Sequence, residues 1–75
     1  MKFVNALSTK RRILRTTHEA LRFIESELPI ELRSLPRWTF AKELLAEAHL
    51  SQKQRDLKYA YRQLRQALQN DSLLI

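Results

Sequence analysis

Basic side chains recur at helical spacing in two segments of this chain. Residues three or four positions apart lie on one face of an α-helix, and the spacing here is three and four throughout. The residues are Arg11, Arg15, His18 and Arg22 in the first segment and Arg55, Lys58, Arg62 and Arg65 in the second. The first ridge would be about 16 Å long at the 1.5 Å rise of a helix. Since arginine binds phosphate through two parallel hydrogen bonds, the spacing predicts contacts along a nucleic-acid backbone.

The run Lys10-Arg11-Arg12 supports the same interpretation. In the first turn of a helix, cations oppose the helix dipole by about 0.3 to 1 kcal/mol each. A purely structural first turn favours Asp or Glu, so these cations indicate an anionic partner. The alternative, which stays open, is that the arginines are solvated flanks whose aliphatic stems cover apolar neighbours.

The segment from Leu44 to Arg55 resembles a helix-turn-helix. Leu50 would be the apolar residue of the turn, and Ser51 would open the recognition helix. Gln52, Gln54 and Arg55 would reach base edges, since glutamine pairs with adenine and arginine with guanine. The alternative is that this segment is only a structural junction, because any short junction between two capped helices gives a similar pattern. The residues predicted to bind nucleic acid or another anionic partner are Lys10, Arg11, Arg12, Arg15, Arg22, Gln52, Lys53, Arg55, Lys58, Arg62 and Arg65.

Residues for catalysis and metal binding are sparse. The chain has no cysteine and no glycine, which excludes thiolate zinc sites and glycine-rich phosphate loops. His18 and His49 are far apart in sequence, and no serine has the surroundings of a nucleophile. We therefore expect no enzymatic activity, no metal and no cofactor.

A net charge of +6 over 75 residues favours an anionic partner. Nucleic acid, an anionic membrane and an acidic protein surface such as that of a transcription complex all qualify. No apolar run approaches the roughly 20 residues that cross a bilayer, and binding to a membrane surface is a minor alternative. Without cysteine, nothing indicates an oxidising compartment, so we expect a cytoplasmic protein.

The elements that position these side chains are predicted to be helices. Two-residue hairpin turns require positive φ angles, and without glycine they are disfavoured, so an all-α fold follows. The expected fold is a single domain, a small three-helix bundle with long first and third helices and a shorter second one. The helices would cover residues 8–28, about 36–49 and 51–70, with residues 1–7 as a flexible arm and 71–75 as an apolar tail that folds back or contacts a partner.

Each predicted helix has an apolar face. The faces consist of Leu14, Thr17, Leu21, Ile24 and Leu28 in the first helix, Ala41, Leu44, Leu45 and Ala48 in the second, and Leu57, Ala60, Tyr61, Leu64, Ala67 and Leu68 in the third. Ser51 and Gln54 have the spacing of a capping box, which predicts that the third helix starts at Ser51.

The leading interpretation is a small non-catalytic regulator that binds nucleic acid or a component of the machinery that works on it. A helical adaptor or inhibitor that binds only protein is the alternative. Its contacts would be aromatic and apolar side chains outside the apolar faces, next to arginine, as in many protein interfaces. The predicted contact residues are Phe3, Val4, Phe23, Trp38 and Tyr59, together with the apolar tail.

One family resemblance belongs to this alternative. The run Arg11-Arg12-Ile13-Leu14-Arg15, followed about 30 residues later by Leu44 to Leu57, resembles the LYR family of three-helix adaptors. Arg11, Leu14 and Arg15 are in register with the family pattern, whereas Thr9 and Lys10 stand where that family has Leu-Tyr, and Leu44 stands where it has Phe. The resemblance implies a three-helix bundle that binds acyl carrier protein and assembly partners.

Overall fold

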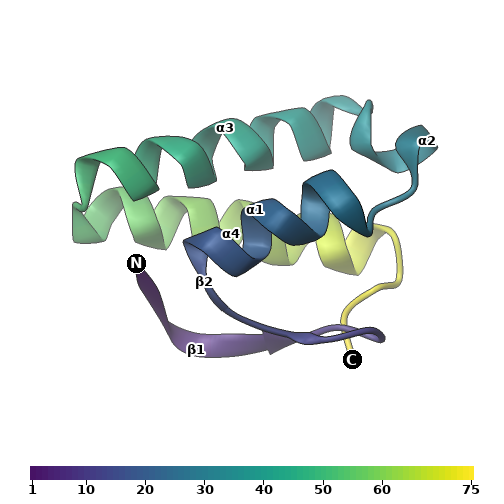
Figure 1. Cartoon of the computed structure of the whole chain (residues 1–75), viewed down its shortest axis with the longest axis horizontal. Helices are drawn as coiled ribbons and strands as arrows, with labels where there is room; N and C mark the ends of the chain where they lie inside the picture. Colours follow the sequence, from purple (N-terminus) through teal and green to yellow (C-terminus); the bar gives the residue numbers. More distant parts are fainter.

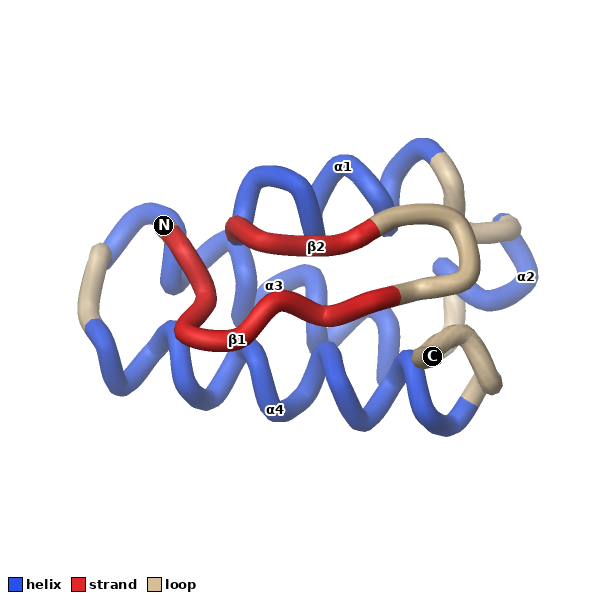
Figure 2. Tube along the Cα trace, turned by 90° about the horizontal axis from the view of Figure 1, so that it is seen from below, coloured by secondary structure: helices blue, strands red, loops and turns tan.

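The computed structural model describes residues 1–75 and contains a β-hairpin and four helices (Figure 1). The elements are β1 (Lys2–Ser8), β2 (Ile13–Thr16), α1 (Thr17–Ser26), α2 (Ile30–Arg33), α3 (Pro36–Ser51) and α4 (Gln54–Asn70). α3 packs along α4, and α1 packs against α3 and β2. The hairpin lies across α1 and α4 on the side away from α3 (Figures 1 and 2). The predicted all-α three-helix bundle is therefore wrong.

The departure from prediction lies in residues 1–16. They form an antiparallel hairpin instead of a flexible arm followed by helical turns. Leu7 pairs with Leu14 near the turn, and both side chains are buried. Lys2 pairs with Thr16 at the open end, and the register shifts between the two pairs because β1 is bulged. The chain thus gains a sheet whose inner face adds to the core.

The hairpin closes without glycine because Thr9 holds its turn. The Thr9 hydroxyl oxygen accepts hydrogen bonds from the backbone N–H groups of Arg11 (3.2 Å) and Arg12 (3.0 Å) and donates one to the Arg12 carbonyl (2.7 Å). The Thr9 N–H also donates to that carbonyl (2.9 Å). None of the four turn residues has a positive φ angle. The absence of glycine disfavours two-residue turns, but it does not exclude a four-residue turn closed by threonine.

α1 begins at Thr17, well after the predicted start at residue 8. Thr16 is its N-cap, and its hydroxyl accepts a hydrogen bond from the Glu19 N–H (3.1 Å). The Glu19 carboxylate in turn accepts one from the Arg15 N–H (2.7 Å). The two bonds resemble a capping box, with the glutamate bonded one residue before the N-cap, and they mark the helix start. The run Lys10-Arg11-Arg12 consequently lies in the hairpin turn, and the argument from the helix dipole does not apply to it.

The junction of α3 and α4 is not a helix-turn-helix. α3 continues through Leu50, whose side chain is 83% exposed, and ends at Ser51. Gln52 then adopts the left-handed conformation with φ 58°, which ends the helix. The Ser51 hydroxyl donates to Asp56 (2.6 Å), and α4 begins only at Gln54. The predicted capping box is wrong, and Leu50 belongs to α3 and not to a turn between helices. The predicted end of the last helix at Asn70 is confirmed.

The core joins the hairpin to α1, α3 and α4. Most of the predicted apolar faces are buried, and the buried members are Leu14, Thr17, Ile24, Leu28, Ala41, Leu45, Ala48, Leu57, Ala60, Leu64, Ala67 and Leu68. Phe3, Phe23 and Trp38 are buried as well, although they were expected to contact a partner. That expectation is wrong because the hairpin and the C-terminal tail cover surfaces that a three-helix bundle would leave open.

The two ends of the hairpin are fixed by different segments. At the open end, the Thr17 N–H donates to the Met1 carbonyl (2.9 Å), and the Thr17 hydroxyl lies 3.1 Å from Nδ1 of His49 on α3. At the turn, the tail runs beside β1, where the Lys10 N–H donates to the Leu73 carbonyl (3.2 Å). Of the two alternatives for the tail, the structure shows the one in which it folds back.

Asp71 anchors the tail to the start of α3. Its carboxylate accepts hydrogen bonds from the Trp38 indole N–H (2.5 Å) and from two nitrogens of Arg37 (2.5 and 3.1 Å). The bond from Arg37 lowers the pKa of Asp71, with the Trp38 bond acting in the same direction against the effect of burial. The same contact raises the pKa of Arg37.

Replacement of the turn hydroxyl tests the account of the hairpin. Thr9→Val keeps the shape of the side chain but leaves the two N–H groups at the turn without their acceptor, so we expect a loss of about 1 to 2 kcal/mol in unfolding free energy. Thr39→Val is the matched control, because the Thr39 hydroxyl only donates to the carbonyl of Leu35 one turn earlier in the chain. Urea unfolding measures both variants. An equal effect of the two substitutions would contradict the role of Thr9.

The Asp71 anchor predicts a specific pH dependence. The pKa of Asp71 in the folded protein lies below its value in the unfolded chain, which is about 3.9. The ionised carboxylate therefore stabilises the fold at pH values above about 3.9, and this stabilisation is lost as the pH falls through the pKa of the folded state. Asp71→Asn should therefore be less stable than the wild type at pH 7 by about 1 to 2 kcal/mol. The difference should shrink below about pH 4. Urea unfolding at a series of pH values measures it, and a difference independent of pH would contradict the account.

Candidate functional site

The outer face of α4 carries four exposed cations. α4 packs through Leu57, Ala60, Leu64, Ala67 and Leu68, which places the basic residues on the opposite side. These residues, called here the α4 stripe, are Arg55, Lys58, Arg62 and Arg65. They extend about 15 Å along the helix axis. The second predicted ridge therefore exists as a single exposed face.

Three members of the α4 stripe have no carboxylate partner. The ion pairs of the structure join Arg12 to Glu27, Arg37 to Asp71, Lys42 to Glu25 and Arg55 to Asp56. Arg55 is only 4.0 Å from Asp56, at the limit of an ion pair. Lys58, Arg62 and Arg65 are thus free to interact with an external anion.

The first predicted ridge does not form. Arg11 lies in the hairpin turn, Arg15 lies on β2, and Arg22 lies on α1, so they share no helix face. Arg12 is paired with Glu27 at 2.5 Å. Lys10 is exposed in the same turn. The structure does not bring these cations together with the α4 stripe in one ridge.

The residues predicted to read bases lie at the corner between α3 and α4. Gln52 ends α3 and donates a hydrogen bond from its side-chain amide to the His49 carbonyl (2.5 Å). Lys53 is the exposed N-cap residue of α4. Without a recognition helix that starts at Ser51, the geometric reason for assigning them to base edges is gone.

Charge is nevertheless distributed unevenly over the fold. The first acidic residue is Glu19, so the hairpin contains five cations and no acid; these cations are Lys2, Lys10, Arg11, Arg12 and Arg15. β1 of the hairpin contacts α4. The acid-free hairpin therefore adjoins the helix that carries the α4 stripe.

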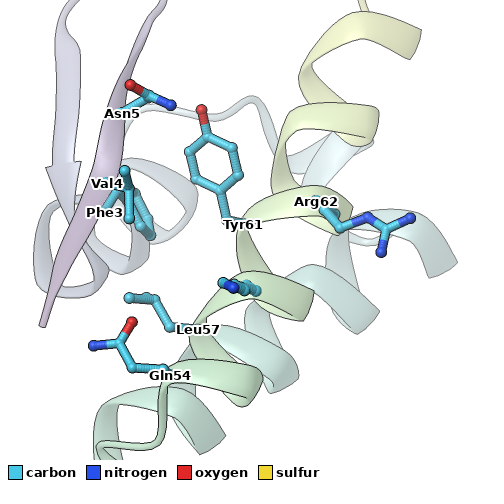
Figure 3. Close-up of a pocket in the computed structure, with 8 residues that line it drawn as sticks. Phe3, Val4, Asn5, Gln54, Leu57, Tyr61 and Arg62 are labelled. Carbon is cyan, nitrogen blue, oxygen red and sulfur yellow. The ribbon is translucent and has the colours of Figure 1, made fainter.

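A groove of about 310 Å³ lies where β1 meets α4 (Figure 3). Its lining consists of Phe3, Val4, Asn5, Gln54, Leu57, Lys58, Tyr61 and Arg62. The rings of Phe3 and Tyr61 pack edge to face, with centroids 5.3 Å apart. The charged residues of the lining are both cations. The groove thus combines apolar walls with a positive rim.

Sequence reasoning did not find this groove. Phe3 was assigned to a flexible arm, and Tyr61 to the apolar face of the last helix. The one available signal was that Tyr61 lies at the edge of that face, beside Lys58 and Arg62 in helical register. Recognising the groove also required β1, which the sequence analysis did not predict.

Of the residues predicted to contact a protein, Val4 and Tyr59 are exposed. Tyr59 packs edge to face against Phe40 of α3, with ring centroids 6.1 Å apart, and both rings are about half exposed. This aromatic pair lies on the α3 side of α4. It is a second, smaller apolar surface.

No cluster of three or more His, Cys, Asp or Glu side chains is arranged to hold a metal ion. None of the helices combines the length and the apolar character needed to cross a membrane. Comparison with models of protein families, with curated proteins and with solved structures gives no match for this chain. The three-helix bundle implied by the LYR resemblance is contradicted, because residues 11–15 lie in the hairpin turn and β2.

Proposed function

We propose that the protein is a small non-catalytic regulator that binds nucleic acid through the α4 stripe. The observation that carries this proposal is that Lys58, Arg62 and Arg65 are exposed on one helix face and have no carboxylate partner. Duplex DNA carries about one negative charge per 1.7 Å of helix axis, so a face of this length meets several phosphates.

The acid-free hairpin supports the proposal. A positive potential summed over neighbouring elements attracts a polyanion more strongly than a single helix does. Lys2 belongs to β1, which contacts α4, and no acidic residue precedes Glu19. Such a regulator would act by occupying nucleic acid, or an acidic face of the machinery that transcribes it, in the cytoplasm.

An adaptor that binds only protein remains the second candidate. The observation in its favour is the exposed pair of Phe40 and Tyr59, since aromatic side chains are enriched at protein interfaces. It lacks three of the contacts first expected of it, because Phe3, Phe23 and Trp38 are core residues. Nucleic-acid binding therefore has the stronger support.

Neutralising the α4 stripe tests the proposal. The double variant Arg62→Gln/Arg65→Gln should bind a fluorescent oligonucleotide about tenfold or more weakly at low salt, because two phosphate contacts are lost. Fluorescence anisotropy measures the affinity. Circular dichroism should show an unchanged fold, since neither arginine has a partner within the chain.

The matched control is Arg22→Gln/Lys42→Gln, which removes the same net charge from α1 and α3. It should retain most of the affinity. If the two double variants lose affinity equally, the protein attracts nucleic acid through its net charge alone, and the α4 stripe is not a binding site. If the folded α4 variant binds as well as the wild type, the proposal is wrong.

A further inference from the structure

We infer that the groove between β1 and α4 takes an unpaired base of single-stranded nucleic acid, with the adjacent phosphates on Lys58 and Arg62. This inference rests on the proposed function, because it specifies which form of nucleic acid the face binds and how. The site is the lining of the groove. The other pocket, at the hairpin turn, also has apolar walls and two cations without ion pairs, Lys10 and Arg11, but its lining includes the carboxylate of Glu27, whereas the lining of the groove contains no acid.

The shape of the groove favours a single strand. Phe3, Leu57 and Tyr61 give it apolar walls, and its volume of about 310 Å³ suits a flat ring rather than a double helix. In a duplex the base faces are stacked on one another and are not accessible to a side chain. In a single strand they are accessible, and proteins bind them by stacking aromatic side chains on them.

Tyr61 is the aromatic residue that would contact the base. Its ring stands between the strand and the helix, with the hydroxyl end directed towards Asn5 (Figure 3). Phe3 packs edge to face against it, so the ring is held in place while remaining only partly buried. A ring held in this way loses little conformational entropy on binding. Stacking of one base on an aromatic side chain contributes about 1 to 3 kcal/mol.

The cations next to the groove complement the negative charge of a nucleotide's phosphate. The Arg62 side chain leaves α4 on the side away from β1, so its guanidinium points away from the apolar walls of the groove (Figure 3). A base in the groove would place a phosphate beside Lys58, and the strand would continue over the outer face of α4 to Arg62 and Arg65. Asn5 and Gln54 supply amide groups at the two ends of the groove, and an amide can both donate to and accept from a base edge.

An acidic peptide that adds a strand to β1 is the rival occupant, and the structure disfavours it. Strand addition needs a regular edge with evenly spaced N–H and C=O groups. The register of β1 shifts between Lys2 and Leu7, and this bulge interrupts its edge next to the groove. Near the turn, the edge is already paired with the tail through Thr9 and Leu74.

The test compares a short oligothymidylate with an abasic strand of equal length, which keeps the phosphates and lacks the bases. Fluorescence anisotropy gives both affinities for the wild type, for Tyr61→Leu and for Tyr59→Leu. Tyr59 is the matched control, because it is a tyrosine of the same helix whose ring packs on Phe40, outside the groove. Tyr61→Leu should weaken binding of oligothymidylate about five- to a hundredfold and leave the abasic strand unaffected. Tyr59→Leu should change neither.

Two outcomes would overturn the inference while leaving the proposed function intact. One is equal binding of both strands to the wild type, which requires no variant and decides the matter even if Tyr61→Leu does not fold. The other is an equal effect of Tyr61→Leu and Tyr59→Leu on a protein that binds oligothymidylate. If neither strand binds, the proposed function fails together with the inference. The proposed function and the inference would likewise both fail if the protein bound an oligoglutamate peptide but neither of the two strands.

Discussion

The packing of the N-terminal hairpin against α1 and α4 determines both the core and the candidate site. Phe3 and Leu7 from β1 and Leu14 from β2 enter the core, where burying an apolar side chain of this size contributes about 1.5 to 3 kcal/mol. In a chain this short, those contributions are a large share of the net stability. The hairpin thus takes the place of the arm and of the first half of the predicted first helix.

The same packing creates the surface that we associate with function. It brings a segment without acidic residues next to the cationic face of α4, and it forms the second wall of the groove. Two cations of α3 are paired with acids, Arg37 with Asp71 and Lys42 with Glu25. Three of the four cations of the α4 stripe have no such partner, which leaves them available to an external anion.

The helical half of the structure could be predicted from the sequence. The apolar spacing in α3 and α4 identified their buried residues except Trp38. The spacing of Arg55, Lys58, Arg62 and Arg65 identified an exposed basic face, because both patterns repeat with the period of the helix. The hairpin could not be predicted by the same reasoning. Leu14, Thr17 and Leu21 also fit a helical face, and the absence of glycine argued against a turn that threonine in fact stabilises.

A more specific signal for the hairpin was present at its end. Thr16 and Glu19 have the spacing of a capping box, which places the start of α1 after residue 15 and leaves the preceding residues for another element. The groove could not be predicted from patterns in the sequence. It depends on the contact between Phe3 and Tyr61, which are distant in sequence and belong to elements of different periodicity.

The salt dependence of binding to a single-stranded oligonucleotide tests the central claim most directly. Each phosphate contact with a single strand contributes roughly −0.7 to the slope of the logarithm of the association constant plotted against the logarithm of the salt concentration. If Lys58, Arg62 and Arg65 each neutralise one phosphate, the slope should be about −2. Binding with a slope near zero would mean that these cations do not meet phosphates. The account of α4 as a nucleic-acid-binding face would then be contradicted.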